Sequence, residues 1–347
     1  MSRADNPIVE GHLVTKDGVT QEISRGTIER LLASSETFWL DLDGLDSEGS
    51  TLLSDTFGFH ALAIEDAERF GQRPKLDPYD EVTVLVLYGA NQGSDLVEVH
   101  CFCAERFLVT IHQVPCPSLR ELAERLHERG LGASDLITLL HKIVDTLIDG
   151  FFPVLDRLDD EIDDLEDQIL EQPTETQLGR LFDMKRSLIS LRRVVTPERD
   201  VFAGLLTGAT SLPNMTPEAE RYFRDVYDHL IRISDLVDSY RDLMSGALDT
   251  YLSTVSNRLN VIMKQLTIIA TIFLPLSFLT GFFGQNFAWM VSHIGGLGWF
   301  VALGIGTQVI AVGLLVVFFR RRGWLTTEGT VPAVSAAGRR GAGGRRA

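Results

Sequence analysis

The stretch LTIIATIFLPLSFLTGFFGQN, residues Leu266–Asn286, decides the architecture of this chain. Up to Phe283 it is apolar except for four hydroxyl side chains. It can cross a hydrocarbon core of about 30 Å, which takes about 20 helical residues. A second apolar stretch, Ile294–Phe319, has only two polar interruptions. Two buried helices of a soluble fold are the alternative, but the absence of any Asp or Glu from Tyr251 to Thr327 favours two membrane spans.

Basic residues flank these two stretches on one side only. Arg258 and Lys264 precede the first stretch and Arg320–Arg322 follow the second, whereas the short connection carries no Lys or Arg. The positive-inside rule then places both termini in the cytoplasm and the connection outside. The N-terminus has no apolar core of a signal peptide, and the Gly/Arg-rich C-terminal tail can contact anionic lipid. We therefore expect a multi-pass protein of the plasma (cell inner) membrane.

The part that precedes the spans is strongly acidic. Residues 1–250 carry 47 Asp or Glu and 23 Lys or Arg, and the net charge of all 347 residues is −16. This balance argues against nucleic acid as a partner, because phosphate binding needs basic patches. It favours cations as partners, or serves solubility alone. The sequence has no nucleotide-binding glycine loop, nucleophile elbow or zinc-protease motif, so we predict neither an enzyme nor a resident cofactor.

Cysteine and histidine offer few metal sites. An odd number of cysteines without framework spacing indicates a reducing compartment. Cys101 and Cys103 face one side of a predicted strand, where they form either a C-x-C metal site or two packed thiols, the interpretation that we favour. The eight histidines are scattered singly, so we expect structural roles for them.

Residues 1–132 are predicted to form a cytosolic α/β domain with a mixed sheet. Residues 50–70 read as helices, and a hairpin is expected at residues 104–106. The predicted strands are Trp39–Leu42, Val82–Tyr88, Val97–Cys103 and Phe107–His112.

The following region is helical. Ser134 is an N-cap candidate for one long helix toward Glu171, and a second helix covers roughly Glu175–Val195. The first helix has an acidic face, which is either a solvated surface or one that concentrates cations. Opposite this face lies an apolar seam formed by Leu155, Leu158, Ile162, Leu165 and Ile169.

A third helix carries the most regular pattern. Thr216-Pro217-Glu218 supplies an N-cap, a first-turn proline and a first-turn acid, and no strong breaker follows before Pro275. A helix from here to Gly284 is roughly 100 Å long at 1.5 Å per residue. Its sustained heptad predicts a packed stalk and consists of Val226, Leu230, Ile233, Val237, Tyr240, Met244, Ala247 and Tyr251.

A polar column follows another face of this helix. Asp228, Asp235, Asp242 and Asp249 are seven residues apart, and the same face becomes small, polar or apolar within the span. If it lines the axis of a ring of subunits, it makes a pore whose acids attract cations. The candidate pore-lining residues are Asp249, Asn260, Met263, Thr267, Ala270, Leu274, Ser277 and Gly281, with Met263 and Leu274 as hydrophobic constrictions.

An ion on this path meets neutral oxygen atoms only. Neutral oxygens suit an ion that keeps its water shell, and Mg²⁺ gives up its waters reluctantly. Zn²⁺ prefers His or Cys, and the spans contain neither, although His293 lies in the outer connection.

The segment Asn257–Phe287 closely resembles the first span of the CorA family of divalent cation transporters. The signature of this family is a Gly-Met-Asn triplet at the outer end of that span. Gly284, Gln285 and Asn286 match it at the first and third positions. Residues 57–88 and the runs WLDLDGL and FFRRRGWL are also similar to the family, so the resemblance covers nearly the whole chain.

The resemblance implies an α+β membrane protein that assembles as a funnel-shaped homopentamer. The triplet would form a ring that binds the hydrated ion at the outer mouth. Asp249 and Asn260 would line the pore, with its gate at Met263 and Leu274. Intracellular Mg²⁺ between cytosolic domains would hold the channel closed, with Asp225 as one regulatory ligand.

The expected organisation follows the chain from the cytosol into the membrane and back. It comprises a cytosolic α/β domain (1–132), a cytosolic helical and stalk region (133–257), the stalk end with the first transmembrane helix (258–285), an outer loop with the signature (286–295), the second transmembrane helix (296–320) and a basic cytosolic tail (321–347).

Two departures from the family pattern bear on the transported ion. Gln285 replaces the usual Met, and the outer loop lacks the acidic residue that is common in the family. Both features resemble the zinc-transporting ZntB branch. Three hypotheses follow: a Mg²⁺ channel that also passes Co²⁺ or Ni²⁺ and is gated by intracellular Mg²⁺, a Zn²⁺ transporter on the same scaffold, and a membrane-anchored binding protein that does not conduct.

Overall fold

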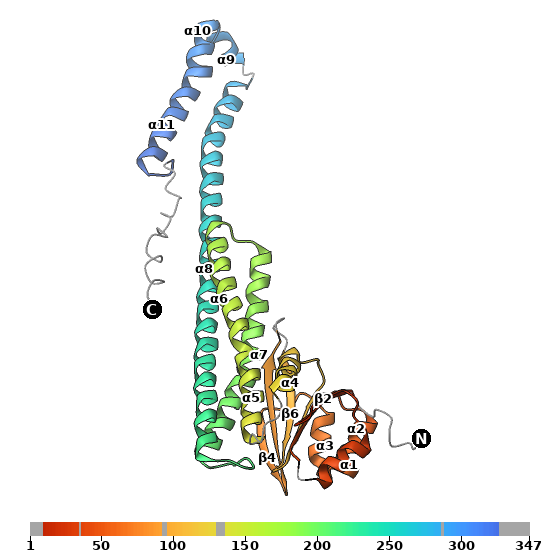
Figure 1. Ribbon diagram of the computed structural model, residues 1–347. Coiled ribbons are helices and arrows are strands. Elements are labelled where there is room, and N and C mark those ends of the chain that lie inside the picture. The colour runs from red at the N-terminus through yellow and green to blue at the C-terminus, as the bar shows by residue number, and fades with distance from the viewer. Residues whose placement is uncertain (1–9, 35, 92–95, 130–135, 286–287, 326–347) are drawn as a thin grey trace. The chain divides into compact units, whose positions relative to one another are not determined.

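The computed structural model describes residues 10–34, 36–91, 96–129, 136–285 and 288–325. The chain divides into two units, residues 1–251 and 252–347. The long helix α8 (Pro217–Phe283) contributes residues to both units (Figure 1).

A seven-stranded sheet with the order β2-β1-β3-β7-β6-β5-β4 forms the base of the first unit. Strands β3 and β7 pair in parallel and all other neighbours pair antiparallel, so the predicted mixed sheet is confirmed. The four predicted strands are present, three of them slightly longer than expected. The bounds are β1 (Gly11–Thr15), β2 (Gly18–Thr20), β3 (Phe38–Asp43), β4 (Lys75–Tyr79), β5 (Val82–Ala90), β6 (Leu96–Cys103) and β7 (Phe107–His112).

Strands β1, β2 and β4 were not predicted. β2 has three residues, and β4 contains Pro78, which removes a backbone donor and argues against a strand in the sequence. Both are edge strands, where a proline and a short length are tolerated. Their pairing depends on neighbours rather than on a local pattern.

Helices cover both faces of this sheet (Figure 1). On one face lie α1 (Arg25–Ala33), α2 (Ser47–Thr51), a π-helical turn η1 (Leu52–Thr56) and α3 (Ala61–Glu68), which confirms the helices expected over residues 50–70. Their side chains share one buried core with the strands, as Ile28 and Leu53 do with Phe102. On the other face, helix α5 (Leu136–Asp149) lies against β5, and α4 (Pro117–Arg129) lies nearby.

The long helix expected to run toward Glu171 is in fact two helices, α5 and α6 (Phe151–Glu171), and its expected N-cap Ser134 lies outside the described residues. The division falls at Gly150. A Cβ atom there would lie 2.7 Å from the carbonyl oxygen of Ala90, so the chain can pass this close to β5 only with glycine. The predicted apolar seam of α6 is confirmed, because all five of its residues are buried.

Helix α7 (Glu175–Leu206) is longer than predicted. It continues through Pro197 instead of ending near Val195. Residues beyond the expected end, including Phe202 and Leu205, are buried and hold the helix against its neighbours. Glu198 adds a contact to the sheet, because its Oε1 accepts a hydrogen bond from the amide of Tyr88.

Helix α8 begins where it was predicted to begin. The Thr216 hydroxyl accepts a hydrogen bond from the Ala219 amide at 3.1 Å and so caps the helix N-terminus. All eight residues of the predicted heptad are buried in the first unit, so the packed stalk is confirmed. Stacking of Phe202 on Phe223, with ring centroids 6.1 Å apart, is one contact between α7 and α8.

The second unit contains the C-terminal part of α8 and four short or medium elements, α9 (Ala288–His293), α10 (Leu297–Trp299), η2 (Phe300–Gly306) and α11 (Thr307–Arg321). Two helices are long and apolar enough to cross a membrane: α8, and the run of 25 residues Leu297–Arg321. Gly323 ends this run with φ of 69°, and the Trp324 amide donates to the Phe319 carbonyl at 2.9 Å.

Candidate ion pathway and divalent-metal cluster

The polar triplet follows the end of α8. The Gly284 amide donates to the Thr280 carbonyl at 2.9 Å, and the Gln285 amide donates to the Phe282 carbonyl at 3.3 Å. A Cβ atom at Gly284 would lie 3.0 Å from the Thr280 oxygen, which is tighter than an ordinary contact. The backbone therefore favours glycine at the first position of the triplet. Asn286 lies outside the described residues.

The aspartate column of α8 lies opposite its packed face. Asp228, Asp235, Asp242 and Asp249 are all exposed, whereas the heptad residues between them are buried. This arrangement leaves the four carboxylates free of the contacts that stabilise the first unit.

The predicted pore-lining residues of the span are also exposed in the single chain. Met263 is 59% exposed and Leu274 is 73% exposed, and neither packs within its own chain. The Thr267 hydroxyl donates to the Met263 carbonyl at 2.7 Å, so its hydrogen bond is made within its own helix. Asn260, Ala270, Ser277 and Gly281 are exposed as well.

Three side chains, two from α5 and one from α8, meet between these two helices. One ligand atom from each of Asp145, Asp149 and His229 lies within 4.8 Å of the other two, and the residues are exposed or partly buried. His229 Nδ1 is 3.3 Å from Asp149 Oδ1. Among the described residues, this is the one group of three or more His, Cys, Asp or Glu side chains close enough to hold a metal ion. We call it the α5–α8 cluster.

The electrostatics of this cluster suit a cation. Partial burial raises the pKa of the Asp149 carboxyl, and the nearby charges of Asp145 and Asp225 raise it further, while His229 opposes the shift. Burial also lowers the pKa of His141, which lies on the same helix as the two aspartates. A bound divalent ion would relieve the repulsion between the carboxylates. Their oxygens suit Mg²⁺, and the imidazole of His229 also suits Zn²⁺, Co²⁺ or Ni²⁺.

Sequence reasoning missed three members of this cluster. Asp145 and Asp149 are four residues apart on α5, and Asp225 and His229 are four apart on α8, so each pair lies on one helix face. That spacing was the available signal, but only the packing of α5 against α8 brings the pairs together. The role predicted for Asp225 stays a prediction, and its position one turn before His229 places its charge beside the cluster.

The two cysteines of β6 are packed thiols. Cys101 and Cys103 are buried and free, and the Cys103 thiol contacts the Cys101 carbonyl at 3.7 Å. Burial raises the pKa of both thiols, which disfavours the thiolate that a metal ion would need.

The CorA-like Mg²⁺ transporter family model matches residues 34–321 of the chain. The chain belongs to the CorA family. It is therefore a divalent metal cation transporter rather than an enzyme, and its two apolar helices fit the membrane spans of a CorA-like fold.

Individual relatives agree with this assignment. The chain is 36% identical over 304 residues to the cobalt/magnesium transport protein CorA of Thermotoga maritima, which covers 84% of each protein. It is 28% identical over 294 residues to the zinc transport protein ZntB of Cronobacter sakazakii, covering 83% of this chain and 88% of ZntB. The fold matches the CorA magnesium transporter of Methanocaldococcus jannaschii with a TM-score of 0.75 at 22% identity, over 91% of this chain and 99% of that structure.

Proposed function

We propose that this CorA-family transporter is a homopentameric channel for hydrated Mg²⁺ in the plasma membrane, with both termini in the cytoplasm. Co²⁺ and Ni²⁺ would share the path. Gly284, Gln285 and Asn286 of the five subunits would form the outer selectivity ring. The observation that carries the proposal is a membrane-length C-terminal segment of α8 that contains no acidic residue and is followed by this triplet.

The chemistry of the span supports an ion that keeps its water shell. Every oxygen that the first span offers is a neutral amide, hydroxyl or carbonyl oxygen, because no Asp or Glu occurs between Tyr251 and Thr327. Such groups bind the waters of Mg²⁺ without replacing them. Two spans cannot enclose a path alone, and the exposed side chains of both helices leave surface for neighbouring copies.

The α5–α8 cluster supports regulation by cytosolic divalent cations. It holds two carboxylates and one imidazole in the first unit, outside the membrane-spanning part of α8. We propose that Mg²⁺ bound at this cluster, with Asp225 beside it, favours the closed channel. Met263 and Leu274 would then close the path by excluding water.

A Zn²⁺ transporter on the same scaffold is the second candidate. It is favoured by Gln285 at the middle of the triplet and by an outer connection without acids. The similarity to the zinc transport protein ZntB also supports Zn²⁺ as the transported ion.

Uptake by the purified protein in liposomes separates the two candidates. Vesicles loaded with a Mg²⁺-sensitive or a Zn²⁺-sensitive dye should report Mg²⁺ entry that exceeds Zn²⁺ entry. Zn²⁺ entry without Mg²⁺ entry would replace the first candidate by the second. Absence of both fluxes, with intact assembly on size-exclusion chromatography, would favour a non-conducting binding protein.

A further inference from the structure

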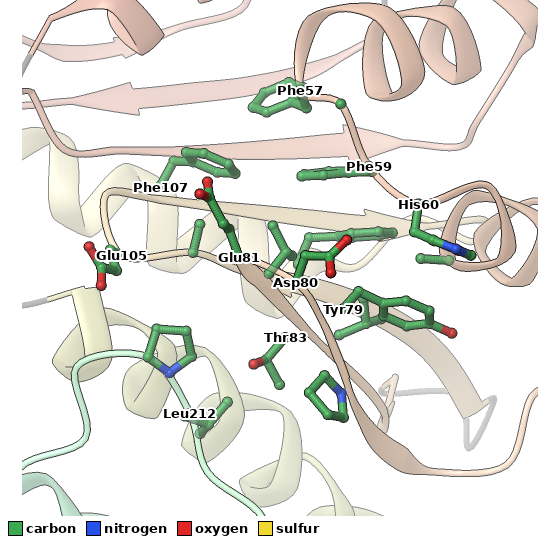
Figure 2. A pocket seen from close by; sticks show the side chains of 18 of the residues that line it. Phe57, Phe59, His60, Tyr79, Asp80, Glu81, Thr83, Glu105, Phe107 and Leu212 are labelled. Atoms are coloured by element: carbon green, nitrogen blue, oxygen red, sulfur yellow. The ribbon is translucent and has the colours of Figure 1, made fainter.

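A cavity of about 1210 Å³ opens on the surface of the first unit. None of the residues predicted to line the ion pathway lines this cavity. Its walls come from the turn between β4 and β5, the turn between β6 and β7, the chain before α3, and the loop between α7 and α8 (Figure 2). It is large enough for a small organic molecule.

Aromatic rings form one wall. The ring centroids of Phe57 and Phe59 lie 5.1 Å apart, and those of Phe57 and Phe107 also lie 5.1 Å apart. Phe59 stacks in turn on the buried Phe102 at 4.6 Å. The faces of such rings carry partial negative charge and attract organic cations as well as apolar groups.

Three of the four charged side chains that line the cavity are acidic. Asp80 and Glu81 form the β4–β5 turn, and Glu105 lies on the β6–β7 turn; all three are exposed. Arg106 also lines the cavity and keeps its positive charge, while Nη1 donates to the Ser34 carbonyl at 2.7 Å and Nη2 donates to the Leu32 carbonyl at 3.4 Å. His60 Nδ1 accepts a hydrogen bond from the Leu62 amide at 3.2 Å, so that nitrogen carries no proton.

The carboxylates lie close to the aromatic wall. In Figure 2, Asp80 and Glu81 lie between the rings of Phe57, Phe59 and Phe107 and the opposite wall with Thr83 and Leu212. Asp80 has φ of 44°, a left-handed conformation for which glycine is the ordinary choice in a two-residue hairpin turn. An aspartate at this position adds a carboxylate where the backbone alone would favour glycine.

Two hydroxyl groups of described residues in the cavity wall have no hydrogen-bond partner. The hydroxyl oxygens of Thr56 and Thr210 are buried and lack a hydrogen-bond partner. Thr83 also lines the cavity and is 7% exposed. Buried hydroxyls are normally paired, so these two groups indicate ordered water within the wall.

We propose that this cavity binds an organic polycation of the linear polyamine class. The methylene chain would lie on the phenylalanine rings, and the ammonium groups would donate to Asp80 and Glu81. The same charges disfavour anionic ligands such as nucleotides. An aromatic wall also distinguishes the cavity from a site for a hydrated divalent ion, which needs oxygen atoms on all sides.

Isothermal titration of the full-length protein in detergent with spermidine tests this proposal. We expect saturable binding that is unaffected by Mg²⁺ at concentrations that fill the α5–α8 cluster. The double variant Asp80→Asn/Glu81→Gln should bind about tenfold more weakly, because two partly exposed charge pairs are lost. Asn accepts the left-handed conformation of residue 80, so this variant keeps the turn.

The matched control is Asp160→Asn/Asp164→Asn, which removes the same charge from the exposed face of α6. It should bind spermidine like the wild type. If both double variants bound spermidine equally weakly, net charge alone would explain the loss of affinity, and the proposal would be overturned. Absence of spermidine binding, or displacement of spermidine by Mg²⁺ one for one, would overturn it as well.

Discussion

His229 Nδ1 and Asp149 Oδ1 lie 3.3 Å apart, with one residue on α8 and the other on α5. The contact joins the helix that continues into the membrane to a helix that lies against the sheet. A cation held by these groups would therefore link the two helices. Removing it would leave Asp145 and Asp149 to repel each other, which links ion binding to the packing of α8.

Asp145→Asn/Asp149→Asn should remove most of the stabilisation that Mg²⁺ gives to the protein. An ion that binds only the folded state at 100 times its Kd adds about 2.7 kcal/mol, and the variant should lose most of this gain. Thermal unfolding in detergent with and without Mg²⁺ measures the difference. Asp160→Asn/Asp164→Asn, an exposed acidic pair with the same spacing on α6, is the control. Equal Mg²⁺ responses in the two variants would contradict a metal site at the α5–α8 cluster.

Asn286→Ala should abolish Mg²⁺ uptake by liposomes while the oligomer persists on size-exclusion chromatography. The amide is the polar side chain that the triplet would offer to the waters of the ion, and alanine offers none. Ser292→Ala in the outer connection should transport like the wild type, because the Ser292 hydroxyl contacts its own helix, at the Trp289 carbonyl and at His293 Nδ1. Wild-type uptake by Asn286→Ala would remove Asn286 from the mechanism.

Asp249→Ala should slow the initial rate of Mg²⁺ uptake or alter its gating. The carboxylate is exposed on the column of α8, where its charge attracts cations, and this attraction is screened by salt. The loss of rate should thus be larger at low than at high ionic strength. Asp200→Ala on α7 removes an exposed carboxylate away from the column and should have little effect. A variant of Asp249 with wild-type rates at both ionic strengths would make this residue part of a solvated surface.

Elements with a local period were predictable, whereas those that depend on distant partners were not. The heptad of α8 and the seam of α6 repeat within single helices, and Thr216 caps its helix through a neighbouring amide, so each was visible in the sequence. The edge strands β2 and β4 have no such signature. The α5–α8 cluster was missed for the same reason, because Asp145 and Asp149 precede His229 by about 80 positions in the chain.

The break between α5 and α6 shows the same limit. Gly150 is one of many glycines in the sequence, and nothing local distinguishes it. Its role depends on the carbonyl group of Ala90, which a Cβ atom would approach to 2.7 Å. A sequence pattern alone therefore favoured one uninterrupted helix.

Gly150→Ala should destabilise the protein by about 1–3 kcal/mol, the usual cost of forcing an extra carbon into a close contact. Chemical unfolding monitored by circular dichroism measures this loss. Gly179→Ala on α7 is the matched control, because a Cβ atom there meets no other atom within 4 Å. It should stabilise the protein by about 0.5–1 kcal/mol, since alanine favours a helix over glycine. Similar destabilisation by both substitutions would contradict a steric role for Gly150.

Glu198 should make the protein less stable as the pH rises. Burial raises the pKa of this carboxyl well above its ordinary value, and the hydrogen bond from the Tyr88 amide opposes the shift only in part. The folded state therefore holds the proton more tightly than the unfolded state. The stabilising contribution of protonated Glu198 to the free energy of unfolding is fully present below the ordinary pKa of a glutamate. It is lost as the pH rises toward the pKa of Glu198 in the folded state.

Glu198→Gln should remove this dependence, because the glutamine oxygen still accepts from the Tyr88 amide and carries no charge. Its free energy of unfolding, relative to the wild type, should increase from pH 5 to pH 8. Denaturant unfolding in detergent at several pH values gives this difference. Glu171→Gln at the exposed end of α6 should show no such trend. A constant difference between Glu198→Gln and the wild type across this range would mean that Glu198 is charged at every pH tested, and that burial does not shift its pKa.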